Sequence, residues 1–286
     1  MVELLARKSL ASVLAFALLA IVGCTPKRPE TPQTPAESPS AGWPTTLNDF
    51  SVTWAAEPGI DLTTGAAVVV RAYMESYYLA YLTDDGKYLY PGFRSSVNPN
   101  EPRGPRGTEA LWPEPRSATT WVGTAGHHLL RITRSGRDVT VLECLYSYRV
   151  GRPGPGGGFE PNIGAGFGPD AGISALRIGL QAPENEESAL PAQEGTSRAP
   201  FENIFGGWRV TRHEGGYLVK ARWADSMRDK AECASRAEGS PENHTFTPGQ
   251  EYPRSAFPTL PATPGWPAKP ARSALNNSAR RSACLG

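Results

Sequence analysis

The chain has 286 residues, with 29 lysines and arginines against 28 aspartates and glutamates, so its formal net charge is +1. A near-neutral chain lacks the basic face that phosphate binding requires, and this argues against nucleic acid as a partner. Its 30 glycines and 28 prolines make up about a fifth of the chain, a share typical of long loops beside a folded core.

Residues 1–23 have the pattern of a signal peptide. Arg7 and Lys8 precede an apolar run from Leu10 to Val22, which is shorter than the roughly 20 residues that a membrane-spanning helix needs. The run ends in the sequence I-V-G-C at Cys24, which resembles a bacterial lipobox. The alternative is an ordinary secretory signal with an incidental cysteine.

The lipobox resemblance implies that Cys24 carries a diacylglycerol on its thiol and an acyl chain on its new amino group. Two or more chains anchor a protein stably, since each buried CH₂ contributes about 0.8 kcal/mol. Residues 24–45 are rich in proline and poor in apolar groups, so we expect them to form an extended tether. We therefore expect a protein at the extracytoplasmic face of the cell membrane, with the membrane as a partner through Cys24.

A long amphipathic helix is predicted over residues 63–82, "TTGAAVVVRAYMESYYLAYL". Thr63 or Thr64 can cap its N-terminus, and Asp84, Asp85 and Gly86 end it. One face carries tyrosines at helical spacing, which line either a pocket for an apolar ligand or a packed core. These tyrosines are Tyr73, Tyr77 and Tyr81. "YLYPGF" follows as a short helix or turn.

Five strand patterns follow, at residues 127–134, 139–150, 173–180, 207–213 and 217–223. The first two flank a serine-glycine turn and predict a hairpin. The last two flank Gly215 and Gly216 and predict another, in which Trp208 lies opposite Trp223 as an inner wall. Three segments rich in glycine or proline are expected to be irregular, namely residues 98–115, 151–172 and 248–270.

One long helix before an antiparallel meander predicts an α+β domain at residues 46–236, with the helix packed on a curved antiparallel sheet of about five strands. The element order and the motifs "VVRAYMES", "YPGF" and "FGGWRV" resemble a nuclear transport factor 2-like (NTF2-like) or cystatin-like cone. With the lipobox, they also resemble the lipoproteins of unknown function that are common in mycobacteria and their relatives. The inserts at 151–172 and 183–206 depart from a minimal cone.

Residues 237–286 form a tail that is too rich in proline for a helix or a central strand. Large apolar side chains recur between its prolines, so we expect residues 246–266 to wrap along the domain and residues from Lys269 onward to be loose.

In an oxidising compartment, the three cysteines beyond Cys24 allow one disulfide and one leftover thiol. We predict a bond between Cys144, in a strand pattern, and Cys233, just beyond the last one, with Cys284 left in the tail. The alternative is three unpaired thiols. No C-x-x-C motif or histidine spacing suggests a zinc site, and we expect no metal and no cofactor.

A possible catalytic pair follows from the first hairpin. If Ser135 and Gly136 form its two-residue loop, His128 lies opposite Glu143, on a face that is otherwise apolar. A histidine beside a carboxylate in a partly dry pocket is suited to general acid or base catalysis. The alternatives are a structural pair, or a register in which Glu143 faces water.

The glycine-rich stretch "GPGGGFEPNIGAGFGPDAG" lacks the following helix of a phosphate-binding loop and is predicted to be a flexible loop. Two hypotheses therefore remain. The first is a membrane-anchored, non-enzymatic module that binds an envelope protein, a peptidoglycan-layer component or an apolar ligand. The second is a small-molecule lyase or isomerase with a cavity site at His128 and Glu143.

Overall fold

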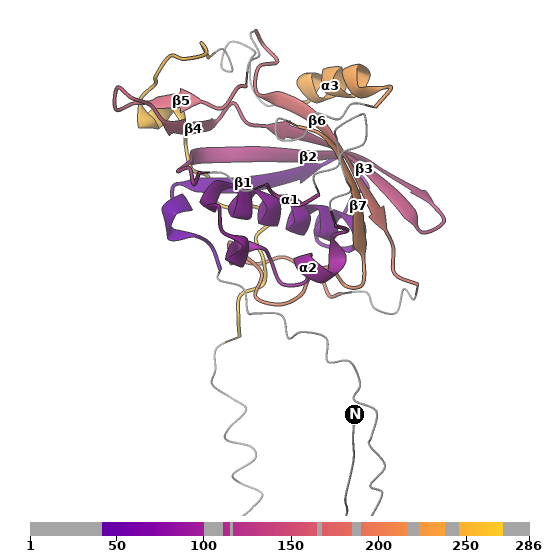
Figure 1. The fold of residues 1–286 in the computed structure, drawn as a ribbon. Coiled ribbons are helices and arrows are strands. Elements are labelled where there is room, and N and C mark those ends of the chain that lie inside the picture. The colour runs from indigo at the N-terminus through magenta and orange to yellow at the C-terminus, as the bar shows by residue number, and fades with distance from the viewer. Residues whose placement is uncertain are drawn as a thin grey trace, which may run out of the picture. The chain divides into compact units, whose positions relative to one another are not determined.

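A computed structural model of the chain describes residues 42–99, 111–114, 117–164, 168–184, 190–216, 223–237 and 246–270. All of them belong to one compact unit, Glu37–Gly286 (Figure 1). The predicted signal peptide, Cys24 and Cys284 lie outside the described residues.

A curved, unclosed sheet of seven strands forms the centre of this unit (Figure 1). Its strand order is β5-β4-β2-β3-β6-β7, and β1 pairs with β2 in parallel while every other pair is antiparallel. The strands are β1 (Phe50–Ala56), β2 (Val122–Ser135), β3 (Asp138–Tyr146), β4 (Val150–Pro153), β5 (Phe159–Pro161), β6 (Ile173–Gln181) and β7 (Arg209–Gly215). The α+β class and the curved antiparallel sheet are thus confirmed, with more strands than predicted.

The β2–β3 hairpin differs from its predicted register. Ser135 pairs with Asp138, so the two-residue loop is Gly136 and Arg137, one residue later than expected. Gly136 adopts a positive φ of 61°, which a residue without Cβ tolerates at the start of such a turn. A bulge between Leu129 and Arg131 then shifts the register again.

Helix α1 (Gly65–Thr83) packs against one face of the sheet (Figure 1). The strands contribute their alternate residues to this face, such as Val139, Val141 and Leu145 of β3. The other sides of α1 are covered by aromatic and aliphatic residues from the chain after it, so nearly every α1 side chain is buried. The predicted amphipathic pattern is therefore wrong for most of the helix.

Three short helical segments lie in the first part of the domain. η1 (Thr45–Leu47) precedes β1, and η2 (Gly86–Tyr88) and α2 (Phe93–Ser96) lie between α1 and β2. The last two fall in and around "YLYPGF", where a short helix or turn was expected. α1 ends at Asp84, which adopts a left-handed conformation with φ 52°.

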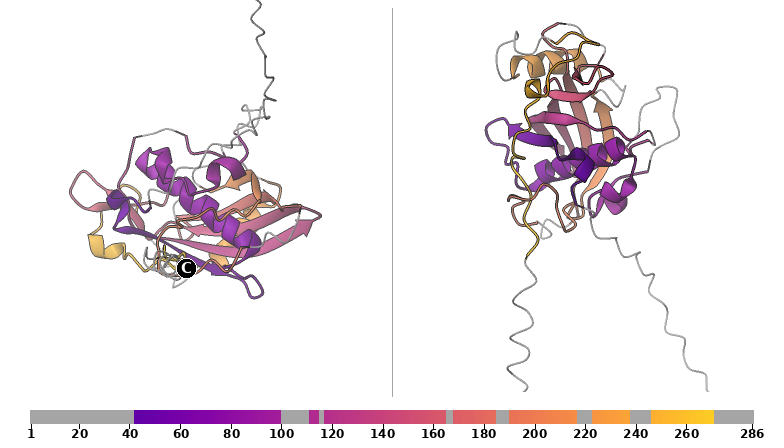
Figure 2. Two further views of the ribbon diagram at one scale, coloured as in Figure 1. Left: turned by 90° about the horizontal axis from the view of Figure 1, so that it is seen from below. Right: turned by 90° about the vertical axis from the view of Figure 1, so that its left-hand side faces the viewer.

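The opposite face of the sheet is covered by α3 (Ser226–Ser235), which sequence patterns did not predict (Figure 2). A second, smaller core lies here, formed by Leu142, Cys144 and Tyr146 of β3 together with Cys233 of α3. Residues 217–222, the predicted last strand, lie outside the described part of the chain.

The glycine-rich segment is more regular than predicted. β4 and β5 form a hairpin within residues 151–172, and its glycine turn binds the carboxylate of Glu251. The backbone N–H groups of Gly156 and Gly158 donate to the two carboxylate oxygens at 2.6 and 2.7 Å. A Cβ on either glycine would come within 2.9 Å of the Glu251 side chain, so this approach requires glycine.

Residues 246–270 pack against the domain and contain one short helix, η5 (Arg254–Ala256). Isolated β-bridges join Tyr252 to Phe159, Thr263 to Thr53, and Trp266 to Ser197. Phe257 and Trp266 are fully buried, with exposed fractions of 0% and 1%. This segment is therefore part of the core as well as of the surface.

Candidate functional site

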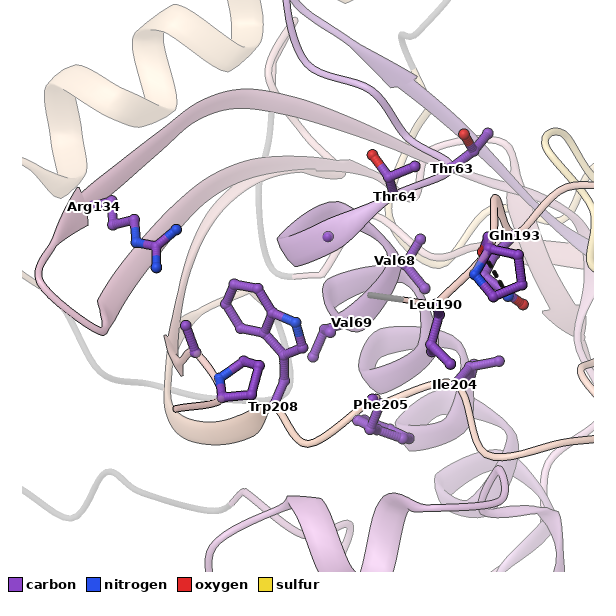
Figure 3. Close-up of a pocket in the computed structure, with 15 residues that line it drawn as sticks. Thr63, Thr64, Val68, Val69, Arg134, Leu190, Gln193, Ile204, Phe205 and Trp208 are labelled. Carbon is purple, nitrogen blue, oxygen red and sulfur yellow. Dashed lines mark hydrogen bonds between the residues drawn. The ribbon is translucent and has the colours of Figure 1, made fainter. Parts of the chain in front are cut away.

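A pocket of about 310 Å³ lies between the N-terminal half of α1 and the chain that leads into β7 (Figure 3). Ligand pockets in proteins start at about this volume. Most of its lining is apolar, and its polar groups come from the loop before α1, from Gln193 and from Arg134. The lining residues are Thr63, Thr64, Gly65, Val68, Val69, Arg134, Ala182, Pro183, Leu190, Pro191, Gln193, Ile204, Phe205, Gly206 and Trp208.

The start of α1 is positioned by Asp61. Its carboxylate accepts hydrogen bonds from the backbone N–H and the hydroxyl of Thr63, at 2.8 and 2.7 Å, and from the hydroxyl of Thr64 at 2.9 Å. The bonds from Thr63 lower the pKa of the Asp61 carboxyl. Thr64 is the N-cap residue, but its side chain bonds to Asp61 instead of capping the helix.

The opposite wall of the pocket follows from a tight turn at Phe205. The side chain of Asn203 accepts a hydrogen bond from Phe205 N–H at 2.9 Å, and Trp208 N–H donates to Phe205 O at 2.9 Å. Gly206 and Gly207 between them adopt positive φ values of 54° and 81°, which reverses the chain. Trp208 thereby faces the pocket, as Figure 3 shows.

The predicted pair of tryptophans is not formed. Trp208 packs against the core on the α1 side of the sheet, whereas Trp223 packs against the second core beneath α3. The indole N–H of Trp223 donates to Asp229 at 2.7 Å. Trp208 thus lines the pocket, whereas Trp223 lies on the other face of the sheet, against the second core.

The three tyrosines predicted as pocket lining do not line this pocket. Tyr73 and Tyr77 are buried and contact His213 of β7 edge to ring, while Tyr81 is half-buried and stacks on Tyr77. Burial raises the pKa of both Tyr73 and Tyr77. In the structure these tyrosines are core residues.

His213 is a buried histidine that sequence patterns did not single out. Its Nδ1 lies 3.0 Å from the hydroxyl of Tyr73, which donates its own proton to Leu111 O at 3.0 Å. Nδ1 must therefore be the protonated nitrogen and donate to Tyr73. Nε2 has no hydrogen-bond partner among the described residues, and burial lowers the pKa of His213 to about 3.

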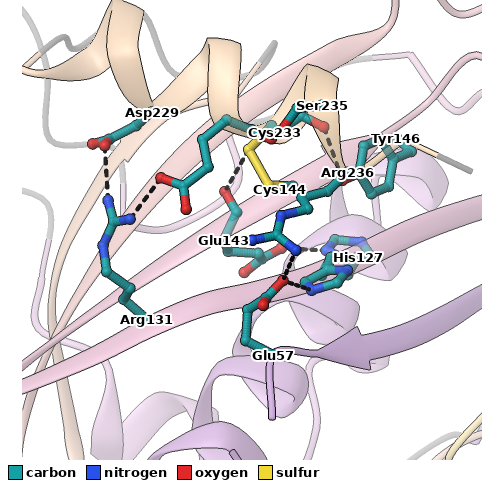
Figure 4. Close-up of a disulfide and its surroundings, with 12 residues drawn as sticks. Glu57, His127, Arg131, Glu143, Cys144, Tyr146, Asp229, Cys233, Ser235 and Arg236 are labelled. Atoms are coloured by element: carbon teal, nitrogen blue, oxygen red, sulfur yellow. Dashed lines mark hydrogen bonds and ion pairs between the residues drawn. A yellow bond between two sulfur atoms is a disulfide. The ribbon is translucent and has the colours of Figure 1, made fainter.

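The predicted pair of His128 and Glu143 is not formed either. Because of the bulge, His128 pairs with Cys144, and its Nε2 contacts the carboxylate of Glu57 at 3.0 Å. The partner of Glu143 is instead His127, whose Nδ1 bonds to Oε1 (Figure 4). Adjacent residues of a strand point to opposite faces, so the one-residue error exchanged the two histidines.

The pair of His127 and Glu143 lies in the core. Both side chains have an exposed fraction of 0%, and His127 stacks on Trp54 with ring centres 4.3 Å apart. The remaining polar atoms, His127 Nε2 and Glu143 Oε2, have no partner among the described residues. A pair that reaches neither solvent nor the pocket is a structural pair.

Two further charged residues are buried on α1, and no signal beyond their position in an apolar helix indicated them. Arg71 has an exposed fraction of 0% and Glu75 of 4%. Glu75 accepts hydrogen bonds from the indoles of Trp54 and Trp266 and from the hydroxyl of Tyr90. Burial raises the pKa of Glu75, and Arg71 opposes this shift. Burial also lowers the pKa of Arg71.

Cys144 and Cys233 form a disulfide that joins β3 to α3 (Figure 4). Around it, Arg131 of β2 forms ion pairs with Asp229 and Glu232 of α3 at 2.9 and 2.6 Å. The disulfide predicted from the sequence is thus present, and it fixes α3 on the sheet face opposite α1.

Within the described ranges, no group of three or more histidines, cysteines and acids is placed to hold a metal ion. No helix of the described part is long and apolar enough to cross a membrane. Comparison with known proteins identifies no matching family model, no matching curated protein and no matching solved structure.

Proposed function

We propose that the protein is a lipid-anchored, extracytoplasmic binding module that holds a small apolar ligand in the pocket beside α1. The supporting observation is the pocket itself, of about 310 Å³, with nine apolar residues among the fifteen described residues that line it. Among the described residues of this lining, Arg134 is the only charged one, and none is an acid, a histidine or a cysteine. Such a lining suits binding better than acid or base catalysis.

The membrane anchor in this proposal rests on the sequence. The basic N-terminus, the short apolar run and Cys24 stand in the order of a lipoprotein signal, and a proline-rich stretch separates them from η1. The anchor would hold the pocket at the membrane, where apolar ligands are concentrated.

The NTF2-like cone is part of the same proposal. A long helix that precedes a curved antiparallel sheet and packs on one face supports it. The parallel strand β1 and the second helix α3 on the opposite face are additions to such a cone.

The alternative of a lyase or isomerase at His128 and Glu143 has no comparable support. The two side chains belong to different contacts, one with Glu57 and the other with His127. We therefore do not propose catalysis by His128 and Glu143.

Fluorescence titration of the full-length protein with N-phenyl-1-naphthylamine, an uncharged apolar dye, tests the pocket. We expect saturable binding at one site. Leu190→Trp places a larger side chain at the half-buried pocket wall and should weaken binding about tenfold, the effect of losing 1.4 kcal/mol.

The matched control is Met227→Ala, which shortens an exposed apolar side chain on α3, on the sheet face opposite the pocket. Its affinity for the dye should equal that of the wild type. Binding that does not saturate, or equal affinities for Leu190→Trp and the wild type, would refute ligand binding in this pocket.

Intact mass spectrometry of the protein from its own membranes tests the anchor. We expect the mass of residues 24–286 plus acyl chains, with two hydrogens gained when the Cys144–Cys233 disulfide is reduced. A chain that begins at Met1 or lacks acyl groups would show that the lipoprotein assignment is wrong.

A further inference from the structure

One buried guanidinium, that of Arg71, connects the pocket wall to the C-terminal part of the chain. Nη1 donates to the carbonyl oxygens of Leu62 and Gln193, at 2.8 and 3.0 Å. Nη2 donates to the carbonyl oxygens of Pro264 and Gly265, at 2.7 and 3.2 Å. These four bonds satisfy the two Nη groups, while Nε has no partner among the described residues. Loss of either segment would leave further buried donors of this charge unpaired, which is costly.

Residues 263–266, which we name the C-terminal strap, are held on α1 by a second buried charge. The indole N–H of Trp266 donates to Glu75 at 2.7 Å. The guanidinium of Arg71 lies over the same indole, 4.3 Å from its ring centre, in a cation–π contact. The two charged residues of α1 therefore bind one side chain of the strap from two directions.

The strap also contacts, through the backbone, residues 195–197, which follow the pocket-lining Gln193 in the chain. Ser197 and Trp266 exchange two main-chain hydrogen bonds, at 2.9 and 2.8 Å. Gly195 lies so close that a Cβ on it would come 2.5 Å from the carbonyl oxygen of Trp266. A shift of the strap must therefore move residues 195–197 as well.

Gln193 carries this contact into the pocket. It lines the pocket, and its backbone N–H donates to Thr63 O at 2.8 Å, at the start of α1. Its carbonyl oxygen is one of the two that Arg71 Nη1 binds. The position of this wall thus depends on Arg71, and the position of Arg71 depends on the strap.

We propose that the C-terminal strap sets the shape and the ligand affinity of the pocket, with Arg71 as the positioning residue that links them. For the ligand, this inference rests on the function proposed above. For the pocket wall, it concerns the chain alone and is testable without a ligand.

The experiment compares the full-length wild type with Trp266→Phe, which loses the bond to Glu75 but keeps an aromatic ring. The first readout is the exchange rate of the Gln193 amide, measured by NMR. We expect exchange about tenfold faster, because the wall opens more often when its support is weakened. The second readout is affinity for N-phenyl-1-naphthylamine, expected to fall about fivefold or more, as for coupled sites.

Two control variants separate this effect from general loss of stability. Ile173→Val removes one methyl group from the core on the α3 side of the sheet. Glu251→Gln weakens the attachment of the same C-terminal segment at the glycine turn, 12 residues before the strap. Neither variant should change the exchange of Gln193 or the dye affinity.

If Trp266→Phe does not fold, Gly195→Ala replaces it, because its methyl group forces the strap and the wall apart. Unchanged exchange at Gln193 in the folded variant, or an equal change in the Ile173→Val control, would overturn the inference. A wild type that binds no dye would instead overturn the proposed function, and the exchange rates would still decide whether the strap positions the wall.

Discussion

His213 predicts how the stability of this domain depends on pH. The imidazole lies between Tyr73 and Tyr77, and its Nε2 has no hydrogen-bond partner within the described part of the chain. Burial lowers its pKa from 6.5 to about 3. As the pH falls below 6.5, the unfolded chain therefore binds a proton that the folded protein does not, and the folded state loses stability.

The size of this effect follows from the two pKa values. At pH 7 the histidine is neutral in both states, and its contribution to the difference is small. At pH 4.5, two units below 6.5, the histidine of the unfolded chain is almost fully protonated, while that of the folded state still binds almost no proton. Protonation therefore stabilises the unfolded state alone. The free energy of unfolding should fall by about 2–3 kcal/mol between pH 7 and pH 4.5 from this residue alone.

Urea unfolding of the wild type and of His213→Phe at several pH values measures this contribution. The phenylalanine keeps the ring volume among the tyrosines and removes the titrating group. Other titrating groups act in both proteins, so the difference between the two curves isolates His213. The wild type should lose about 2–3 kcal/mol more than the variant over this range. Parallel curves would refute the reasoning, because they would mean that His213 is not held neutral by burial.

Three further predictions concern the buried pair, the disulfide and the glycine turn. Glu143→Ala leaves His127 buried without its partner and should lower the free energy of unfolding by about 3 kcal/mol. The double variant His127→Phe with Glu143→Leu should lower this free energy by less. A larger decrease in the double variant would contradict a purely structural pair. Cys144→Ala with Cys233→Ala opens a link across 89 residues and should destabilise the protein by up to about 4.5 kcal/mol in urea unfolding; a loss below 1 kcal/mol would mean that the reduced chain is already constrained. Glu251→Gln and Gly158→Ala each weaken the contact at the glycine turn and should each lower the free energy of unfolding by about 1 kcal/mol. In a double-mutant cycle, the double variant should lose less stability than the sum of the two single variants. Additive losses would mean that the two residues do not interact.

Several features of this protein followed from local sequence patterns. The start of α1 near Thr64, the β2–β3 hairpin and β6 were readable because side-chain period and turn residues are local properties. The disulfide was predicted because a strand cysteine and a cysteine beyond the last strand had no better partner. Sequence patterns missed β1, β4, β5 and α3. β4 and β5 are short and lie in a glycine-rich segment, and α3 is rich in charge. β1 was missed although Phe50, Val52 and Trp54 alternate along it.

The register of the hairpin shows how a small local error affects a predicted site. Moving the turn from Ser135 to Gly136 and adding a bulge at Leu130 changes the partner of Glu143 from His128 to His127. At the bulge, Leu129 packs in the core on the α1 side of the sheet, and Leu130 packs in the second core on the opposite side. A sequence pattern contains neither constraint, so it cannot fix which of two adjacent histidines faces inward.

The sequence by itself determined the composition class and predicted the α+β order of elements and the pairing of Cys144 with Cys233, both of which the structure confirms. The lipoprotein-type N-terminus stays a prediction. Only the tertiary structure decided that Arg71 and Glu75 are buried, that Trp266 contacts both of them, and that a pocket forms beside Trp208. The reason is physical. Periodicity and turn chemistry act over a few residues, whereas the contacts of Arg71 with Gln193 and Gly265 join positions 122 and 194 residues apart.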